Sequence, residues 1–253
     1  MISKPHGLFP KGKVVRFFYS PKTRIIMKKL LLGIAAVCLA GFTFAQDAPL
    51  WMRHSVISPD GTTIAFTYKG DIYTVPVAGG RAMQITTNPA YDTAPVWSPD
   101  SKRIAFASDR MGSLDVYIVA KDGGEPRRLT THSGSETPLA FTDAGHVLFS
   151  AGIMPSAEAV VFPSNGQFNQ VYRVSVEGGR PTMISSMPME CISINKEGAM
   201  LYQDKKGYED YWRKHHVSPI ARDIWMYTPG KEPQYRQLTT FGGEDREPVW
   251  APD

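Results

Sequence analysis

The chain has 253 residues, of which 42% are hydrophobic and 21% charged, a composition typical of a globular protein rather than a disordered one. Its formal net charge of +4 comes from the first 46 residues, which hold eight lysines and arginines and no acidic residue. The remainder has 20 basic and 24 acidic side chains, so this mildly acidic body gives no support for nucleic-acid binding.

A secretory signal peptide is predicted over 27–45, where two lysines precede a short apolar run and small residues precede Gln46. Residues 1–26 are expected to be an unstructured upstream extension, because Met27 begins a complete signal by itself. An uncleaved anchor is the less favoured alternative, since the apolar run is short for a membrane span. The signal predicts an exported protein, periplasmic or secreted, that meets the membrane only during export.

The rest of the chain repeats three short phrases in a fixed order. The first phrase is VISPDGTTIAF at 56–66, which aligns with VWSPDSKRIAF at 96–106; a weaker third copy lies at 139–149 and a fourth at 192–202. The second phrase is DIYTV at 71–75 and its variants, and the third begins with Gly-Gly or the looser GKEP. SPDG is typical of a tight turn, and the alternation of polar and apolar residues in DIYTV is typical of a half-buried strand.

Each period of 40–50 residues therefore predicts four short strands, a to d, that cannot bury their faces alone. The expected fold is all-β: an incomplete β-propeller of four four-stranded blades, preceded by a signal-peptide helix. The blades are expected at about 51–87, 93–131, 137–186 and 189–240. The expected strands lie near 52–57, 62–67, 71–77, 81–86, 94–97, 103–108, 114–120, 126–130, 138–141, 146–150, 169–176, 181–186, 190–194, 199–203, 222–227 and 234–240.

The chain ends on PVWAPD, which repeats PVWSPD at 95–100. We therefore expect 247–253 to be the first strand of a fifth blade, with Trp250 equivalent to Trp97, and the chain to be a fragment of a longer protein. A β-sandwich would not repeat the same phrases in fixed order, and a helical solenoid would need a 3.6-residue period. Cys191, the one cysteine after the signal, lies in an apolar stretch and is expected to be buried.

These phrases resemble the PD40 repeats, with a consensus around WSPDG-x-x-IAF, of TolB and of tricorn-type peptidases, over residues 51–253. Bacterial tricorn-type homologues are similar to this chain in three segments: the run YEDYWRKHHVSPIARDIW at 208–225 and the first-blade segments 51–61 and 67–80. The resemblance implies a secreted serine peptidase related to the C-terminal processing peptidases, with a six-bladed first propeller, a PDZ-like module and a catalytic core. No catalytic residue is carried over, because no position here matches the motifs of that core.

The chain contains no GxSxG, HExxH or GxGxxG motif, and no catalytic residue, metal ligand or cofactor is expected. His215 and His216 suggest a metal or acid–base site, but neighbours in an extended chain point to opposite faces, which favours a local loop pair. Trp212, Arg213 and Lys214, with these histidines, are the candidates for contact with a partner or peptide. For Trp212 the alternative is packing onto the propeller.

Alternating strand directions place the long excursions 151–168 and 204–221, both b–c connections, on the same face as the d–a connections. That face is expected to contact downstream PDZ-like and catalytic domains, or peptides and proteins; self-association stays open. The first hypothesis is a substrate-gating or docking propeller of a secreted tricorn-like serine peptidase, inactive by itself. The alternatives are a non-catalytic TolB-like periplasmic propeller that binds a protein partner, and the propeller of a prolyl-oligopeptidase-type enzyme.

Overall fold

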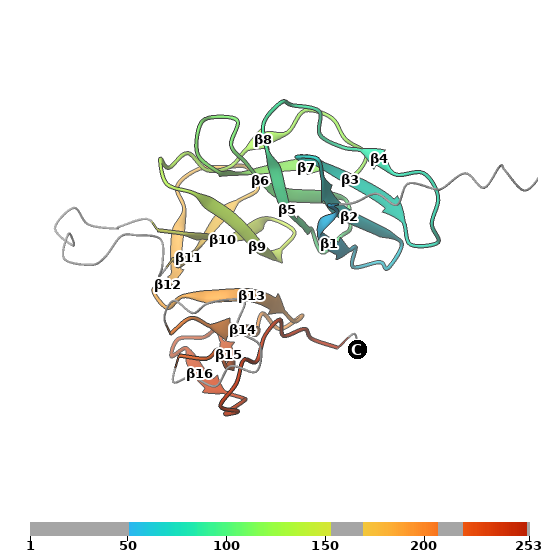
Figure 1. The fold of residues 1–253 in the computed structure, drawn as a ribbon. Helices are drawn as coiled ribbons and strands as arrows, with labels where there is room; N and C mark the ends of the chain where they lie inside the picture. The colour runs from blue at the N-terminus through green and yellow to red at the C-terminus, as the bar shows by residue number, and fades with distance from the viewer. Residues whose placement is uncertain (1–50, 153–168, 207–219, 252–253) are drawn as a thin grey trace, which may run out of the picture. The chain divides into compact units, whose positions relative to one another are not determined.

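The computed structural model describes residues 51–152, 169–206 and 220–251 (Figure 1). The chain divides into Met1–Pro49 and Leu50–Asp253, and every described residue belongs to the second unit. The predicted upstream extension and signal-peptide helix therefore lie outside the described residues. Within the described ranges there is no helix, and so none that could span a membrane.

The described residues contain sixteen strands in four antiparallel sheets, and each sheet uses four consecutive strands in chain order. The first two sheets contain β1 (Arg53–Ile57), β2 (Thr63–Tyr68), β3 (Asp71–Pro76), β4 (Met83–Gln84), β5 (Asp92–Trp97), β6 (Arg103–Ser108), β7 (Asp115–Ala120) and β8 (Arg127–Arg128). The next two contain β9 (Glu136–Asp143), β10 (His146–Ala151), β11 (Gln170–Ser175), β12 (Thr182–Ser185), β13 (Met189–Ile194), β14 (Met200–Asp204), β15 (Ile224–Thr228) and β16 (Gln234–Gln237). Figure 1 shows the sheets following one another from blue to red. The predicted incomplete β-propeller is confirmed, and each sheet is a blade.

The outermost strands are shorter than expected, and β4 and β8 have two residues each. A threonine hydroxyl explains why these ladders end early. The backbone N–H of Ile72 donates to Thr86 Oγ at 3.0 Å, and that of Val116 donates to Thr130 Oγ at 2.9 Å. The recurring Thr at the end of the third phrase thus supplies a side-chain acceptor where the sheet would otherwise use a backbone carbonyl.

Each blade packs aromatic side chains against aliphatic side chains of the blade before it. The rings of Phe106 and Tyr117 stack with 5.9 Å between centroids and share a buried cluster with Ala65, Ile72 and Ile85. The equivalent positions form the next two clusters: Phe149 and Tyr172 with Ala105, Val116 and Leu129, then Tyr202 and Trp225 with Leu148, Val171 and Ile184. Burying one such side chain contributes about 1.5–3 kcal/mol, so these clusters hold neighbouring blades together.

The SPDG phrase forms the predicted tight turn. Gly61 N donates to the Ser58 carbonyl at 2.8 Å, and Ser58 Oγ donates to Asp60 Oδ1 at 2.6 Å. Ser58 Oγ also accepts from Thr63 N at 3.0 Å, which closes the turn from within. Gly61 has a φ of +70°, in the left-handed region that glycine adopts readily, whereas Ser101 takes the same position in blade two with a φ of +57°.

Trp97 and Trp250 occupy equivalent places, as predicted. The indole Nε1 of Trp97 donates to the Val56 carbonyl at 3.2 Å, and that of Trp250 donates to the Ser193 carbonyl at 3.1 Å. Both acceptors stand two residues before an a–b turn in the preceding blade. No strand is assigned over 247–251, the described part of the expected fifth blade, because a ladder needs a paired neighbouring strand.

A left-handed residue interrupts the innermost strand in three blades. His54, Ala94 and Cys191 have φ values of +49°, +50° and +51°, and each stands four residues before its a–b turn. The register of the ladder shifts across the same points, which is the signature of a β-bulge. The prediction that Cys191 is buried is wrong: the residue lies at this bulge and its side chain is exposed.

Candidate functional site: the loop face

Antiparallel order gives each blade two ends with different connections. The a–b and c–d turns lie at one end, here called the turn face, and the b–c and d–a connections lie at the other, the loop face. The turns are short, whereas both long excursions leave from the loop face. Because variable loops on a rigid scaffold are the usual place for binding, the loop face is the candidate functional surface.

Short polar contacts tie the turn face together from blade to blade. Asp60 N in blade one donates to Ser101 Oγ in blade two at 3.1 Å. The guanidinium of Arg103 in blade two donates to the backbone carbonyl of Ala144 in blade three. These bonds make the turn face part of the scaffold.

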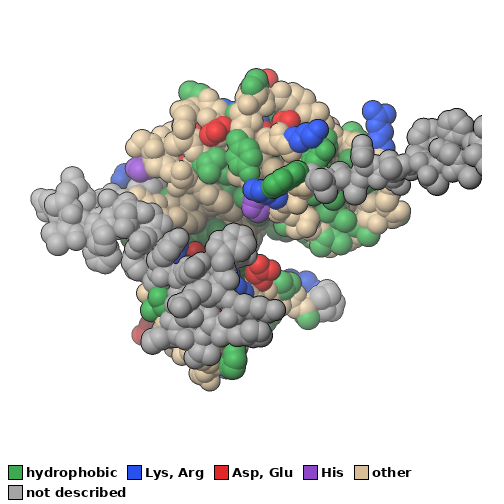
Figure 2. Space-filling view, in the orientation of Figure 1, with side chains coloured by type: hydrophobic (Ala, Val, Ile, Leu, Met, Phe, Trp, Pro, Cys, Tyr) green, Lys and Arg blue, Asp and Glu red, His purple; other side chains and the backbone are tan. Residues whose placement is uncertain are grey.

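The loop face instead exposes large hydrophobic side chains in its described connections: Trp51, Tyr91, Met111, Met187 and Phe241. Trp51 and Phe241 keep 74% and 69% of their surface accessible. Among the described turns of the opposite face, Val77 is the one large hydrophobic side chain so exposed. Figure 2 shows exposed hydrophobic side chains beside charged ones on the surface in view. In the described connections, exposed large hydrophobic side chains are therefore more numerous on the loop face than in the turns of the opposite face.

Acidic residues stand at the start of strand a, or shortly before the expected one, at three of the four junctions between successive blades. The backbone N–H of each donates to the carbonyl of a residue one or two positions before strand c of the preceding blade. Asp92 N donates to the Gly70 carbonyl at 2.7 Å, Glu136 N to the Leu114 carbonyl at 2.7 Å, and Asp245 N to the Arg222 carbonyl at 2.9 Å. We define the four junctions by the residue at strand c and the residue at the next strand a: Asp71/Asp92, Asp115/Glu136, Gln170/Met189 and Asp223/Asp245.

The first junction contains a buried ion pair. Arg110 Nη2 lies 2.8 Å from Asp92 Oδ2, and the carboxylate is fully buried while the guanidinium side chain is 13% exposed. The same guanidinium lies over the rings of Phe106 and Tyr117, with its Cζ 5.5 Å and 5.0 Å from their centroids. This arrangement holds the b–c turn of blade two rigidly against the d–a connection before it.

The second junction carries two buried carboxyl groups and one nearby cation. Arg128 Nη2 lies 2.8 Å from Asp115 Oδ2, and Asp115 and Glu136 are both fully buried. Burial is the main cause that raises the pKa of Glu136, to about 7, with a contribution from the charge of Asp115. The nearby Thr130 hydroxyl and His132 backbone N–H act in the opposite direction on this pKa.

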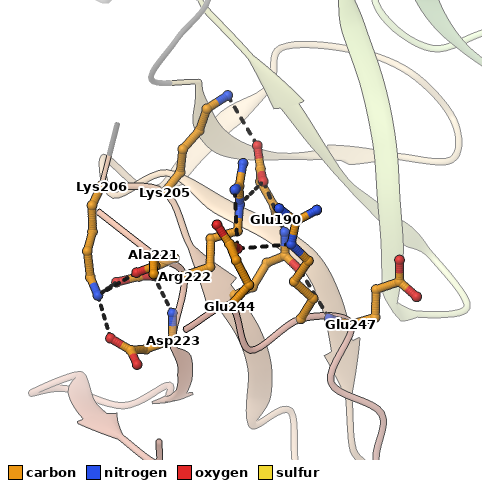
Figure 3. Close-up of polar contacts among 11 residues, drawn as sticks. Glu190, Lys205, Lys206, Ala221, Arg222, Asp223, Glu244 and Glu247 are labelled. Atoms are coloured by element: carbon orange, nitrogen blue, oxygen red, sulfur yellow. Dashed lines mark hydrogen bonds and ion pairs between the residues drawn. The ribbon is translucent and has the colours of Figure 1, made fainter. Parts of the chain in front are cut away.

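The excursion between β14 and β15 leaves the propeller through a polar neck (Figure 3). Lys206 Nζ donates to the Ala221 carbonyl at 2.9 Å and pairs with the Asp223 carboxylate, so the two ends of the excursion meet. Asp204 Oδ1 accepts from Asp223 N at 2.9 Å, and Asp204 Oδ2 accepts from Trp225 Nε1 at 3.2 Å. Burial works to lower the pKa of Lys206, but the two carboxylates outweigh it and the pKa is raised.

A second set of ion pairs surrounds the neck. Glu190 lies 3.2 Å from Lys205 Nζ and 3.3 Å from Arg222 Nε, and Glu244 lies 3.5 Å from Arg222 and 2.9 Å from Arg246. Burial would raise the pKa of Glu190, but Lys205 and Arg222 outweigh it, so the group stays ionised at neutral pH. These contacts join blade four to the d–a connection that follows it, and Arg222 pairs with both Glu190 and Glu244 (Figure 3).

The predicted contact residues Trp212, Arg213, Lys214, His215 and His216 lie outside the described residues, so their role stays a prediction. The structure does describe the neck, formed by the residues at the two ends of this excursion, which the sequence analysis missed. A signal for it was present, since charged residues flank the excursion in QDKK at 203–206 and ARD at 221–223. Across the described ranges, no three histidine, cysteine or acidic side chains come together as metal ligands.

Four-stranded blades joined by these junctions define a β-propeller domain. Comparison with known families matches residues 49–253 to the tricorn protease N-terminal β-propeller domain. The chain therefore belongs to this family of propeller domains.

Individual relatives agree with that assignment. Tricorn protease homolog 1 of Streptomyces coelicolor is 24% identical over 207 residues, which cover 81% of this chain and 18% of the relative. The crystal structure of the tricorn protease matches with a TM-score of 0.62 and 18% identity, over 81% of this chain and 20% of that one. A putative TolB from Agrobacterium tumefaciens matches with a TM-score of 0.53 and 22% identity, over 77% and 69% of the two chains. Both structural matches show the fold alone, and the chain spans less than a quarter of either tricorn relative.

Proposed function

We propose that this chain is the N-terminal propeller region of a secreted tricorn-like serine peptidase. In this proposal the propeller gates or docks peptide substrates, and a C-terminal catalytic core outside the chain hydrolyses them. Membership of the tricorn propeller family and the similarity to Tricorn protease homolog 1 support the class of the parent protein. The predicted signal peptide at 27–45 supports export to the periplasm or beyond the cell.

The observation that carries the docking role is the difference between the two faces. The described loop-face connections expose several large hydrophobic side chains, such as Met111 and Phe241, and both long excursions leave from this face, whereas the turns of the opposite face are short and tied between blades. Peptides and the downstream PDZ-like and catalytic domains are the proposed partners of this loop face. Methionine and aromatic side chains suit partners of varied sequence, because they adapt to many apolar shapes.

The test replaces residues 207–219 with a short Gly-Ser linker in the full-length parent protein. The replacement leaves the Lys206–Ala221 contact in place, so the neck can still close and the propeller should fold. We expect peptide turnover to fall at least tenfold in kcat/KM while far-ultraviolet circular dichroism stays unchanged. The 253-residue chain alone should show no peptidase activity.

The matched control replaces the c–d turn at 121–124, on the turn face, with a Gly-Ser sequence of the same length. This variant should keep the turnover of the parent. Unchanged turnover after replacement of 207–219, with a folded propeller, would contradict the docking role.

A non-catalytic TolB-like propeller that binds a protein partner is the second candidate, and the match to the Agrobacterium tumefaciens protein favours keeping it. The downstream reading frame separates the candidates. A PDZ-like module followed by a processing-peptidase core supports the first, and a stop codon soon after the propeller supports the second. A GxSxG motif there would instead indicate a prolyl-oligopeptidase-type enzyme.

A further inference from the structure

The second junction differs from its neighbours in its balance of charge. Asp115 at the start of β7 and Glu136 at the start of β9 are both fully buried, and Arg128 pairs with Asp115. In the described part of the chain, no lysine or arginine forms an ion pair with Glu136. A buried carboxylate without a cation is costly, so this position favours the protonated form.

Other groups around Glu136 do not replace the missing cation. The ionisable side chains on the strands packed against β9 are Asp92 of β5, Arg103 of β6, Asp115 and Tyr117 of β7, His146 of β10, and Glu190 and Cys191 of β13. Arg103 donates to the Ala144 carbonyl, and His146 pairs with Asp143 at the opposite end of β9, on the turn face. The nearby charge that acts on Glu136 is Asp115, and it repels a second negative charge.

The other junctions avoid this conflict by different means. In the first, Arg110 neutralises Asp92 while Gln84 and Thr86 donate to Asp71. In the fourth, Asp223 pairs with Lys206 and accepts from Gln237. In the third, the two positions are Gln170 and Met189, which carry no charge. Among the four pairs of junction residues defined above, Asp115/Glu136 is the one in which both members are buried acids.

We propose that the second junction is a proton-operated latch between blades two and three. A proton on the Glu136 carboxyl, shared with the Asp115 carboxylate, holds the start of β9 against blade two, and its release to water as the pH rises loosens the d–a connection 131–135. The latch is independent of whether the loop face binds peptides, because it is a property of the junction itself.

The direction of the pH dependence follows from the pKa of Glu136. This pKa is raised from 4.5 to about 7 in the folded chain, so between these values the closed junction binds more protons than the open one. Opening therefore becomes easier as the pH rises through this window, by up to about tenfold per pH unit. Above pH 7 the effect levels off, since Glu136 is then ionised in both states.

The experiment is amide hydrogen exchange on the 253-residue chain at several pH values from 5 to 8.5, corrected for intrinsic exchange. The reporters are Glu136 N, bonded to the Leu114 carbonyl, and Val116 N, bonded to Thr130 Oγ. We expect the opening constant of wild type to rise by at least tenfold between pH 5.5 and 7 and then to level off. The Glu136→Gln variant, whose amide is neutral and can donate to Asp115, should show no such rise.

The matched control is Glu125→Gln, which changes an exposed carboxyl in the c–d turn of the same blade and should keep the wild-type profile. The proposal is overturned if Glu136→Gln and wild type show the same pH dependence. Should the Gln variant fail to fold, carbon-13 NMR titration of the wild-type Glu136 carboxyl decides the matter. A midpoint near 7 supports the latch, and a midpoint near 4.5 overturns it.

Discussion

The first two junctions and the third use the same strand positions but different chemistry. Asp92 and Asp115 are fully buried acids with arginine partners, whereas the third junction has Gln170 and Met189 at these positions and relies on the cluster around Tyr202. The apolar cores of all three junctions follow one pattern of aromatic against aliphatic side chains. Hydrophobic packing is therefore the shared source of cohesion, and the polar groups are what distinguishes one junction from the next.

Breaking the Arg110–Asp92 ion pair of the first junction should cause the largest loss of stability. Arg110→Met leaves the fully buried Asp92 carboxylate without its cation, which should lower the free energy of unfolding by about 3 kcal/mol. Urea denaturation followed by tryptophan fluorescence measures it. Lys121→Met, at an ion pair with 47% and 76% exposed side chains, is the control and should change stability by less than about 1 kcal/mol. Equal losses in the two variants would contradict the distinction.

Removing the Thr130 hydroxyl, a hydrogen-bond acceptor in blade two, should lower the free energy of unfolding by an intermediate amount. Thr130→Val keeps the shape of the side chain but leaves the buried N–H of Val116 without its acceptor, at a cost of about 2 kcal/mol. Thermal unfolding measures the loss. The exposed neighbour Thr131 provides the matched Thr→Val control, for which we expect little change. Stability equal to wild type in Thr130→Val would show that the hydroxyl does not serve the ladder.

A single substitution at the third junction should raise the stability of the protein. Tyr202 is fully buried, its hydroxyl makes no hydrogen bond with the described residues, and burial raises its pKa. The equivalent residue is Phe106 in blade two and Phe149 in blade three. Tyr202→Phe should therefore stabilise the protein by about 1 kcal/mol, seen as a higher unfolding temperature, while Tyr235→Phe at an exposed site should have no effect. Destabilisation by Tyr202→Phe would mean that the hydroxyl is satisfied.

Much of the fold could be predicted from local sequence. SPDG, DIYTV and the Gly-Gly phrase each determine a turn or strand through their own backbone preferences, and their fixed order implies a repeated sheet. Trp97 and Trp250 were placed correctly because they hold the same position within the repeat.

Features that depend on a neighbouring blade could not be predicted in this way. Cys191 lies in an apolar run, but a bulge without a glycine to mark it leaves the thiol exposed. Ser101 holds a left-handed conformation that the sequence assigns to glycine, and its hydroxyl accepts a bond from blade one. Glu136 looks like an ordinary loop acid until the fold places Asp115 beside it. The predicted contact residues around Trp212 lie outside the described ranges and stay a prediction.

The tryptophan contacts have a mechanical consequence. Trp97 and Trp250 each fix one blade to the next by a directional N–H bond, but blades three and four carry Phe141 and Ile194 at that position, which have no donor. The joint between blades two and three gains directional bonds elsewhere, from Glu136 N to the Leu114 carbonyl and from Arg103 to the Ala144 carbonyl. The joint between blades three and four, with Ile194 and the uncharged Gln170/Met189 pair, relies most on apolar contact, so bending between neighbouring blades should be easiest there.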